Sequence, residues 1–421
     1  MASEDWKTIS QKKRESNASK IPAEWKLSKE ILDKYDSESH QSVLDVPRTC
    51  GVLSEKEVEI TEKYDATALL EKLAKKEMSS VEVVTAFCKR AAVAQQLIKC
   101  LTEMFFDQAL ERAKECDDYL AKNGKPMGPL HGLPISLKDS FNVKGVTATI
   151  GYVSFAKNPP AEQNSVLVDM LLEQGAVFYV KTNIPQTMMT ADSDNNLFGR
   201  TLNPHGLHLT AGGSTGGEGS LLGFHGSVLG VGTDIAGSVR IPALCNGIMG
   251  FKPTAGRVPF GRKVPPGRLG SPGPILPCIG PEAHSIRDME LWLRTVIEAE
   301  PWNYDALTLS VPWRQVEPYN RPLKLGLLLE DKSRPLLPPI LRCFTKVKEA
   351  LRSAGHEVVE FTPEQVPDLW QSAILCWKIF MLDPSQKAMQ FIKDSGEPLI
   401  NSIPTSTFPE LKDWKPTLDE L

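Results

Sequence analysis

Glycine is concentrated in one short segment of this chain. Twelve of its 30 glycines fall between residues 212 and 250, which leaves 18 for the rest of the 421 residues. Glycine at this density weakens helices and strands, because it adds entropy to the unfolded chain and brings no side chain to pack. We therefore expect this segment to need bare backbone. Close approach of that backbone to a ligand is the reason that would offset the cost.

The chain around this segment alternates short apolar runs with amphipathic stretches. Residues 132–138 and 176–181 predict two strands, and residues 165–174 between them predict a helix. The same order returns between residues 323 and 361. Strands that alternate with helices are typical of α/β proteins with parallel neighbouring strands. Large α/β enzymes reach this length around one sheet, so we expect one large domain with appendages.

The first third of the chain predicts helices. Apolar residues at helical spacing indicate two helices between residues 66 and 100, and a third over 105–121 that ends at an Asn-Gly pair. Residues 1–60 are rich in Lys, Glu and Ser and predict an arm that packs through apolar anchors such as Trp25. Further along, residues 253–281 are rich in proline and predict a surface loop.

Charge and cysteine content exclude several classes of protein. Nucleic-acid-binding proteins usually carry a clustered excess of positive charge, whereas this chain has a net charge of -4 at pH 7. The 8 cysteines form no C-x-x-C pair and the 7 histidines show no metal-ligand spacing, so we expect no metal and no disulfide framework. The polar, acidic start lacks the features of a signal peptide, and no apolar run is long enough to span a bilayer. We expect a cytoplasmic protein that binds neither nucleic acid nor membranes.

Two serines of the glycine-rich segment are candidate catalytic residues. Ser214 lies in AGGSTGGEGS at 211–220, and Ser238 lies in GVGTDIAGSVRIP at 230–242. A loop with so little side-chain cover can point several backbone N–H groups at one spot, which is what a tetrahedral oxyanion needs. A single Gly-Ser pair is more often just a turn. The high density of glycine and serine over the whole block is what favours a catalytic role.

These two segments resemble the signature of the amidase-signature family, which runs from a GGS[ST]GGE turn to a GTDI[GA]GS[IV]R segment. In that family the nucleophilic serine follows the first serine of the turn by 24 positions, and Ser238 follows Ser214 by the same number. The family also has a lysine at the end of a short strand, and PISLKD places Lys138 there. The resemblance is strong over residues 60 to 260. Within the family the chain is most similar to fungal general amidases of the acetamidase type.

The resemblance implies an α/β fold in which helices cover both faces of a central mixed β-sheet. It divides the chain into an N-terminal arm, residues 1–60, and an amidase-signature domain, residues 61–421. Family members normally continue with further strands and helices, so the domain is expected to be shortened at its C-terminus. An incomplete sheet would leave an exposed edge and apolar surface, which favours oligomerisation, for example as a homodimer.

The resemblance also implies a Ser-Ser-Lys triad. Ser238 is the nucleophile, and Ser214, which has a cis peptide bond in the family, relays its proton to Lys138 and later returns one to the leaving amine. Because an ammonium cannot accept a proton, burial must lower the pKa of Lys138. Water then hydrolyses the acyl-enzyme, and no cofactor is needed. We expect small to medium monocarboxylic amides such as acetamide as substrates, with release of ammonia.

Other residues of the motif receive substrate-binding or structural roles. By family analogy, Met188 lines the acyl site, although methionine is more often plain packing. The oxyanion hole and substrate contacts map onto Ser214 and the backbone amides of Ile235, Ala236, Gly237 and Ser238. The methyl group of Ala236, where the family often has glycine, is tolerable if its φ stays negative.

Four further polar residues of the same block are expected to be structural. Thr215, Asp234 and Arg240 are expected to hold the loop by hydrogen bonds or an ion pair. Glu218 is expected in the first turn of a helix, where its charge would complement the helix dipole.

Other functions remain open. Residues 212–216 also match G-x-S-x-G, which would make Ser214 the nucleophile of an α/β-hydrolase esterase, but the polar residues 203–210 do not predict the buried strand that must precede it. A shortened, inactive family member that acts as a binding protein is a second alternative. A subunit of the transfer-RNA amidotransferases is a third, which the N-terminal arm disfavours.

Overall fold

The computed structural model describes residues 5–265, 275–328, 335–382, 386–403, 409–411 and 414. By its internal contacts the chain divides into two compact units. The first comprises residues 1–313 and 385–404, and the second comprises residues 314–384 and 405–421. Each unit is described separately here. The predicted division into residues 1–60 and 61–421 stays a prediction.

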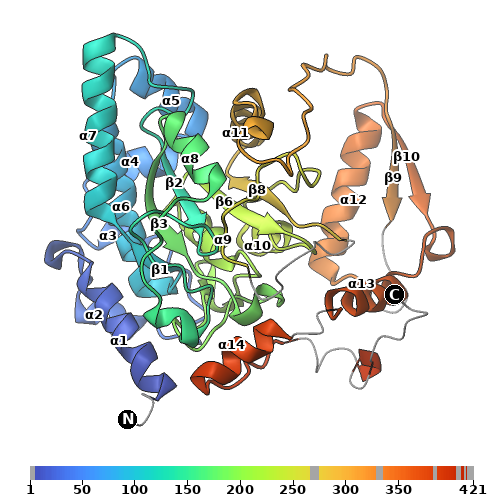
Figure 1. The fold of residues 1–421 in the computed structure, drawn as a ribbon. Coiled ribbons are helices and arrows are strands. Elements are labelled where there is room, and N and C mark those ends of the chain that lie inside the picture. Colours follow the sequence, from blue (N-terminus) through green and yellow to red (C-terminus); the bar gives the residue numbers. More distant parts are fainter. Residues whose placement is uncertain are drawn as a thin grey trace. The chain divides into compact units, whose positions relative to one another are not determined.

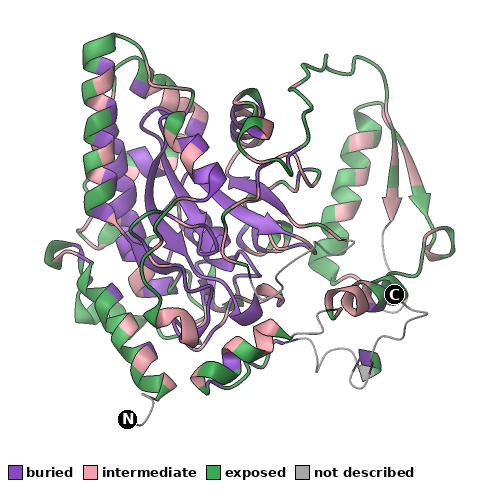
Figure 2. Ribbon diagram, viewed as in Figure 1, coloured by how far each residue is buried: buried purple, intermediate pink, exposed green. Residues whose placement is uncertain are grey.

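A six-stranded mixed sheet forms the centre of the first unit (Figure 1). Its strand order is β1-β3-β2-β6-β8-β7, where β2 is parallel to β3 and β6 and the other pairs are antiparallel. The strands are β1 (Leu101–Met104), β2 (Pro134–Lys138), β3 (Val177–Thr182), β6 (Leu229–Asp234), β7 (Met249–Gly250) and β8 (Cys278–Ala283). Every residue of β1, β2, β3, β6 and β8 is buried (Figure 2). Continuous apolar runs are typical of such strands, because both of their faces are covered.

Helices flank this sheet, as the predicted fold class requires. The helices of the first unit are α1 (Trp6–Ser19), α2 (Lys29–Lys34), α3 (Val46–Thr49), α4 (Glu55–Lys63), α5 (Ala66–Ala74), α6 (Ser80–Ile98), α7 (Phe106–Asn123), α8 (Val166–Glu173), α9 (Gly216–Gly223), α10 (Arg240–Asn246), α11 (Ile286–Glu298) and α14 (Lys387–Ser395). A small antiparallel pair, β4 (Leu202–Asn203) and β5 (Gly206–Thr210), lies outside the main sheet.

The predicted N-terminal helices are confirmed, and local signals explain their ends. A capping box between Ser79 and Glu82 starts α6, so two orphan groups of the first turn are satisfied reciprocally. The next helix, α7, ends at Gly124, whose φ of 68° lies in the left-handed region that favours glycine. The arm packs as expected, since Ile21 and Trp25 are buried in the main hydrophobic core.

The predicted loop over residues 253–281 was wrong at its end, and its residues 266–274 lie outside the described residues. Residues 278–281 belong to the buried strand β8, which lies between β6 and β7. Pro281 has no N–H to donate, but its carbonyl accepts a hydrogen bond of 3.1 Å from the N–H of Phe251. Proline density indicated a loop because proline is rare inside sheets.

The second unit contains the β-α-β order predicted between residues 323 and 361. Strands β9 (Lys324–Leu328) and β10 (Glu357–Phe361) are parallel and flank α12 (Pro338–Ser353) in sequence. They form a two-stranded sheet of their own and do not extend the main sheet. Helix α13 (Leu369–Phe380) follows. No helix of the described residues is long and apolar enough to cross a bilayer.

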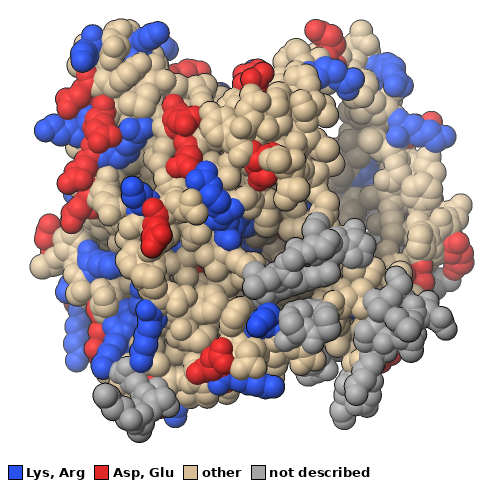
Figure 3. Space-filling view, in the orientation of Figure 1, with Lys and Arg blue, Asp and Glu red and all other residues tan. Residues whose placement is uncertain are grey.

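Charge is distributed without segregation on the face that Figure 3 draws. Basic and acidic side chains are interspersed there. Ion pairs among the described residues include Lys63 with Glu59 and Arg112 with Glu115. The described residues on that face therefore form no basic stripe of the kind that nucleic-acid binding leaves.

Candidate functional site

Lys138, the last residue of β2, is fully buried in the main sheet. Its Nζ lies 2.7 Å from Ser214 Oγ, 2.9 Å from Thr215 Oγ1 and 2.9 Å from Thr233 Oγ1. All of these partners are neutral hydroxyl groups. The site therefore solvates an amine by hydrogen bonds but supplies no direct carboxylate partner for an ammonium.

Burial lowers the pKa of Lys138 to about 7. Removal from water disfavours the charged amine, and this outweighs the opposite effect of the neighbouring acidic groups Glu282, Asp234 and Glu218. A substantial fraction of Lys138 is thus neutral at pH 7. By residue type alone it would be a surface lysine with a pKa near 10.4. The structure meets the requirement that a lysine acting as base must satisfy.

One of the two candidate serines contacts this lysine. Ser214 is buried, and the peptide bond between Gly213 and Ser214 is cis, as the family resemblance implies. Ser238 is half-buried, and its carbonyl accepts a hydrogen bond of 3.1 Å from the N–H of Thr215. Ser214 is thus joined to Lys138 by a side-chain hydrogen bond, and the next residue, Thr215, is joined by its backbone to the loop that carries Ser238.

The loop that carries Ser238 is held by an ion pair. The Arg240 guanidinium donates to both carboxylate oxygens of Asp234, at 3.1 and 3.0 Å. The same carboxylate accepts from the N–H of Gly237 at 2.8 Å and of Val239 at 3.1 Å. These bonds keep the pKa of Asp234 below its usual value even though burial opposes this. The expected structural role of Asp234 and Arg240 is confirmed.

The backbone amides expected in the oxyanion hole differ in their availability. The N–H of Gly237 is engaged with Asp234, as described above. Those of Ile235, Ala236 and Ser238 donate to none of the described residues. Ala236 is exposed, and its φ is not positive. Its backbone therefore accommodates the methyl group that replaces the hydrogen of a glycine. Three of the four amides are thus free to receive an oxyanion.

Glycines of the central strand make room for side chains of the protein itself. A Cβ on Gly230 would lie 2.4 Å from Glu218 Oε2, and one on Gly232 would lie 2.6 Å from Thr215 Cγ2. A Cβ on Gly213 would lie 2.5 Å from the carbonyl of Thr190. The expected need for bare backbone is therefore met at these positions by neighbouring protein atoms, and close approach to a ligand is not their reason.

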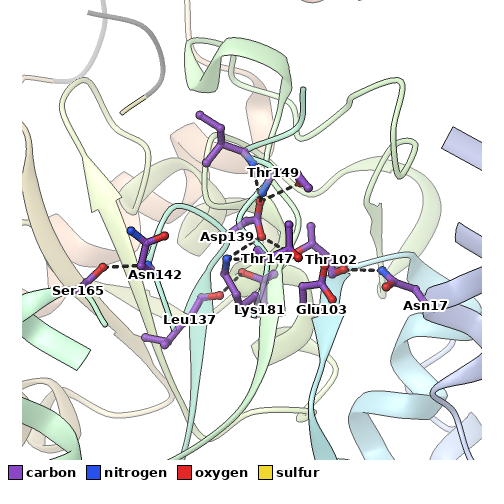
Figure 4. Close-up of polar contacts among 12 residues, drawn as sticks. Asn17, Thr102, Glu103, Leu137, Asp139, Asn142, Thr147, Thr149, Ser165 and Lys181 are labelled. Carbon is purple, nitrogen blue, oxygen red and sulfur yellow. Dashed lines mark hydrogen bonds and ion pairs between the residues drawn. The ribbon is translucent and has the colours of Figure 1, made fainter. Parts of the chain in front are cut away.

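Asp139, which directly follows Lys138, anchors this end of β2 (Figure 4). Its fully buried carboxylate lies 3.1 Å from Lys181 Nζ and accepts hydrogen bonds of 2.7 Å from Thr102 Oγ1 and 2.6 Å from the N–H of Ile150. The ends or side chains of three strands, β1, β2 and β3, and the loop that carries Ile150 thus meet at one carboxylate, which restricts where the neighbouring Lys138 can lie. Sequence reasoning gave no role to this network, because its members are far apart in the chain.

We expect Lys181→Met to destabilise the protein by about 3–5 kcal/mol, the usual cost of leaving one partner of a buried ion pair uncompensated. Urea unfolding monitored by circular dichroism measures this loss. As the matched control, Lys72→Met removes an exposed pair with Glu77 and should cost less than about 1 kcal/mol. Equal losses in the two variants would show that the Asp139–Lys181 pair anchors nothing.

Met188 packs against an apolar cluster of the first unit. The buried residues of this cluster are Ile150, Tyr152, Ile184 and Ile392, and the φ of 58° places Met188 in the left-handed region. Such backbone is uncommon for a residue with a side chain and is concentrated at functional sites. Its expected role at the acyl site stays a prediction.

Glu218 occupies the first turn of α9, as expected, but its expected role was wrong. Its carboxyl is buried, lies 2.5 Å from Ser136 Oγ and accepts a hydrogen bond of 2.9 Å from Thr182 Oγ1. Burial raises its pKa to about 8, so it is largely neutral at pH 7 and cannot complement a dipole by charge. Glu282 on β8, also fully buried, was missed entirely. A lone acidic residue inside the apolar run CIGPEA was the available signal.

Among the described residues, no group of three or more metal-ligating side chains is present. The polar groups that the fold brings together are hydroxyls, an amine and buried carboxyls. This set suits proton transfer from a hydroxyl nucleophile.

Comparison with known proteins connects this site to a family. The model of the Amidase family matches residues 82–416. A protein named Amidase from Gibberella moniliformis is 44% identical over 397 residues, which cover 94% of this chain and 74% of that protein. Acetamidase from Emericella nidulans is 42% identical over 416 residues, which cover 97% of this chain and 73% of the acetamidase.

Two solved structures extend the comparison to the fold. Fatty acid amide hydrolase superposes with a TM-score of 0.86 at 36% identity, over 94% of this chain and 69% of that one. A bacterial aryl acylamidase of the amidase-signature family superposes with a TM-score of 0.67 at 25% identity, over 82% of this chain and 70% of that one. The mixed sheet with flanking helices is thus a fold that these proteins share.

Proposed function

This chain belongs to the Amidase family, and on that premise we propose that it hydrolyses small to medium monocarboxylic amides with a triad of Ser238, Ser214 and Lys138. Amide hydrolysis as such follows from the family. One observation carries the assignment of the triad: Lys138 Nζ lies 2.7 Å from Ser214 Oγ inside the core. The pKa of this lysine is lowered to about 7, so its amine can accept a proton.

The first half of the proposed reaction acylates Ser238. Neutral Lys138 accepts the hydroxyl proton of Ser214, which in turn takes the proton of Ser238 as the Ser238 Oγ attacks the substrate carbonyl carbon. The free N–H groups of Ile235, Ala236 and Ser238 receive the negative charge that develops on the carbonyl oxygen. Preorganised donors of this kind contribute about 3 kcal/mol each in comparable enzymes.

The second half releases both products. The Lys138 ammonium returns its proton through Ser214 to the leaving nitrogen, so the C–N bond breaks and ammonia departs. A water molecule then attacks the ester carbonyl of acylated Ser238 and gives its proton to the same relay. The carboxylate leaves and the hydroxyl of Ser238 is restored. No step requires a redox partner or a cofactor.

The names of the relatives and the apolar residues around Met188 guide the choice of substrates. One relative is called an acetamidase and one solved structure is a fatty acid amide hydrolase, so acyl groups of very different size occur in proteins similar to this chain. Met188 lies among apolar side chains, which suits an acyl group without charge. We propose acetamide, benzamide and hexanamide as the first substrates to compare.

We expect ammonia release from these amides to depend on pH through Lys138. The protonated amine cannot accept a proton, so kcat/KM should fall about tenfold for each pH unit below its pKa of about 7 and level off above it. Rate measurements between pH 5 and pH 9 test this. A rate that rises as the pH falls would exclude Lys138 as base, and absence of activity toward all amides would favour a binding protein.

The alternative that Ser214 is the nucleophile of an α/β-hydrolase has little structural support. The elbow of that fold follows a strand of the central sheet. In contrast, β5, the strand before Ser214, pairs among the described residues with β4 alone, outside the main sheet. Moreover, Ser214 contacts a buried lysine rather than a histidine.

A further inference from the structure

The loop of residues 186–196 contacts the turn that carries Ser214. Ser193 Oγ donates to the carbonyl of Gly212 at 3.0 Å and accepts a hydrogen bond of 2.9 Å from the N–H of Gly216. Its side chain therefore binds the backbone on both sides of Ser214. The loop and the turn are held together at the serine that contacts the proposed base.

The apolar cluster against which Met188 packs is tied to the chain directly after β2. Ile150, a buried member of the cluster, donates its N–H to the carboxylate of Asp139 at 2.6 Å. Val264, which packs against the cluster, donates its N–H to the carbonyl of Ser140 at 3.1 Å. The cluster is thus anchored at the two positions that follow the end of β2, where the proposed base lies.

Two successive residues of the loop have left-handed backbone. The φ of Thr187 is 70° and that of Met188 is 58°. Residues with a side chain rarely adopt this region, so two in a row persist only where the surrounding structure determines their conformation. Within the loop, the N–H of Gln186 donates to the carbonyl of Asp194 at 2.9 Å, and that of Met188 donates to the carbonyl of Pro185 at 3.1 Å. Further restraint comes from a segment distant in the chain.

The side-chain amide of Gln186 is held by the segment that follows α14. Its Nε2 donates to the carboxylate of Glu397 at 2.9 Å and to the carbonyl of Pro398 at 3.1 Å. Its Oε1 accepts a hydrogen bond of 3.1 Å from the N–H of Ile400. Because a carbonyl can only accept and a backbone N–H can only donate, this buried amide has one possible orientation.

The buried carboxylate of Glu397 joins the two ends of the loop. Its Oε2 accepts from the side-chain amide of Gln186 and, at 3.0 Å, from that of Asn196. Its Oε1 accepts from the N–H of Val153 at 2.8 Å and lies 3.1 Å from Ser395 Oγ. A buried carboxylate is costly unless its oxygens receive hydrogen bonds. Here those bonds fix residues 186 and 196 at one point.

We propose that Glu397 and Gln186 are positioning residues that hold Met188 in place and thereby set how strongly the enzyme prefers long acyl groups to short ones. This inference rests on the proposed function, in which the apolar residues around Met188 suit the acyl group. Helix α14, which precedes Glu397, contributes to the same cluster the residues Ala388, Met389, Phe391 and Ile392. One segment thus covers the cluster and also restrains the loop of Met188.

We expect Glu397→Met to lower the ratio of kcat/KM for hexanamide to that for acetamide by about tenfold, the lower end of what one methylene group contributes in a hydrophobic pocket. Methionine has a similar length but accepts no hydrogen bond from either end of the loop. Met188 then loses its fixed position, and contact with the longer acyl chain suffers most. Gln186→Met should lower the ratio by less, because Asn196 still binds Glu397.

The conservative variant Glu397→Gln should keep most of the selectivity. A glutamine has one accepting oxygen and one NH2 group that can only donate. With its oxygen toward Gln186 and Asn196, its NH2 group can donate to Ser395 Oγ and opposes a single donor, the N–H of Val153. The reverse orientation would oppose two donors. The favoured orientation therefore preserves the bonds to both ends of the loop.

The matched control is Asp288→Leu. Asp288 is another buried carboxyl of the same unit, and it accepts from the N–H groups of Ala66 and Thr67. This variant should lose stability without changing the ratio of the two amides. An unchanged ratio in both Glu397→Met and Gln186→Met, or an equal change in the control, overturns the proposal.

Hydrogen–deuterium exchange measured by mass spectrometry tests the restraint without any substrate. Peptides that cover residues 184–200 should exchange faster in Glu397→Met and in Gln186→Met than in wild type, and Asp288→Leu should instead affect peptides that cover residues 64–74. Unchanged exchange of residues 184–200 in both loop variants sinks the inference. Wild-type ammonia release that is lost in Ser238→Ala would still support the proposed function in that case.

Discussion

Ser238→Ala should abolish amide hydrolysis, with kcat reduced by about 100,000-fold, because removal of a hydroxyl nucleophile leaves only the contribution of binding and the oxyanion hole. The physical reason is that no other group of the site can form the acyl-enzyme. Ser214 is buried and in contact with Lys138, so its hydroxyl is committed to the relay. Ammonia release from acetamide, benzamide and hexanamide, measured with the purified variant and wild type, checks this.

The control for this substitution is Ser220→Ala, a serine of the same glycine-rich block. Its hydroxyl donates to the carbonyl of Leu202 inside the core, and no hydrogen bond joins it to Lys138, Ser214 or Ser238. It should retain activity and lose some stability. Ser238 is half-buried and its hydroxyl makes no hydrogen bond with a described residue, so Ser238→Ala should unfold at the wild-type temperature. Activity retained in Ser238→Ala would instead favour the α/β-hydrolase alternative, with Ser214 as nucleophile.

Lys138→Met should lower kcat by about 1,000- to 10,000-fold, the upper part of the range for loss of a general base. Methionine fills a similar volume but has no lone pair to accept the proton of Ser214. Lys138→Arg separates two roles that a lysine could have. Arginine keeps a positive charge and cannot be deprotonated in a protein, so it should be as inactive as methionine.

Steady-state rates of the two variants at pH 6 to 9 make this comparison. In wild type, kcat/KM should rise through pH 7 as Lys138 loses its proton, whereas the residual rates of both variants should lack that step. If Lys138→Arg kept a large part of the activity, Lys138 would act as a fixed cation and the proposed relay would be wrong. Circular dichroism of each variant establishes that the loss is not due to unfolding.

Several elements of this fold were predictable because local signals determine them. Strand β2, helix α8 and strand β3 follow the predicted order. The apolar residues of each segment follow the spacing of a single type of secondary structure, and glycine or serine residues mark where the segment begins or ends. Helix α7 ends at the predicted Asn-Gly pair for the same kind of reason. The β-α-β order of residues 323–361 was also predictable, but its separate sheet was not. Strand partners are chosen by contacts between residues distant in the chain.

The site was predictable only through the resemblance. Spacing and residue type marked Ser214 and Ser238, while Lys138 would have been a surface lysine by type alone. The missed residues, Asp139 and Glu282, are buried against residues of other strands, and nothing in their immediate sequence indicates those neighbours. Strand β8 was not predicted, because Pro281 belongs to a proline-rich stretch and such stretches usually form loops.

The sequence by itself determined the strand-helix-strand order of residues 132–181 and 323–361, the end of α7 and the glycine-rich segment, because backbone preferences and hydrophobic periods act over a few residues. Only the tertiary structure decided that Lys138 is buried among hydroxyls, that Glu218 is neutral and that Gly230 and Gly232 make room for protein side chains. The pKa of a group depends on desolvation and on charges that arrive from other strands. These quantities exist only once the chain has folded.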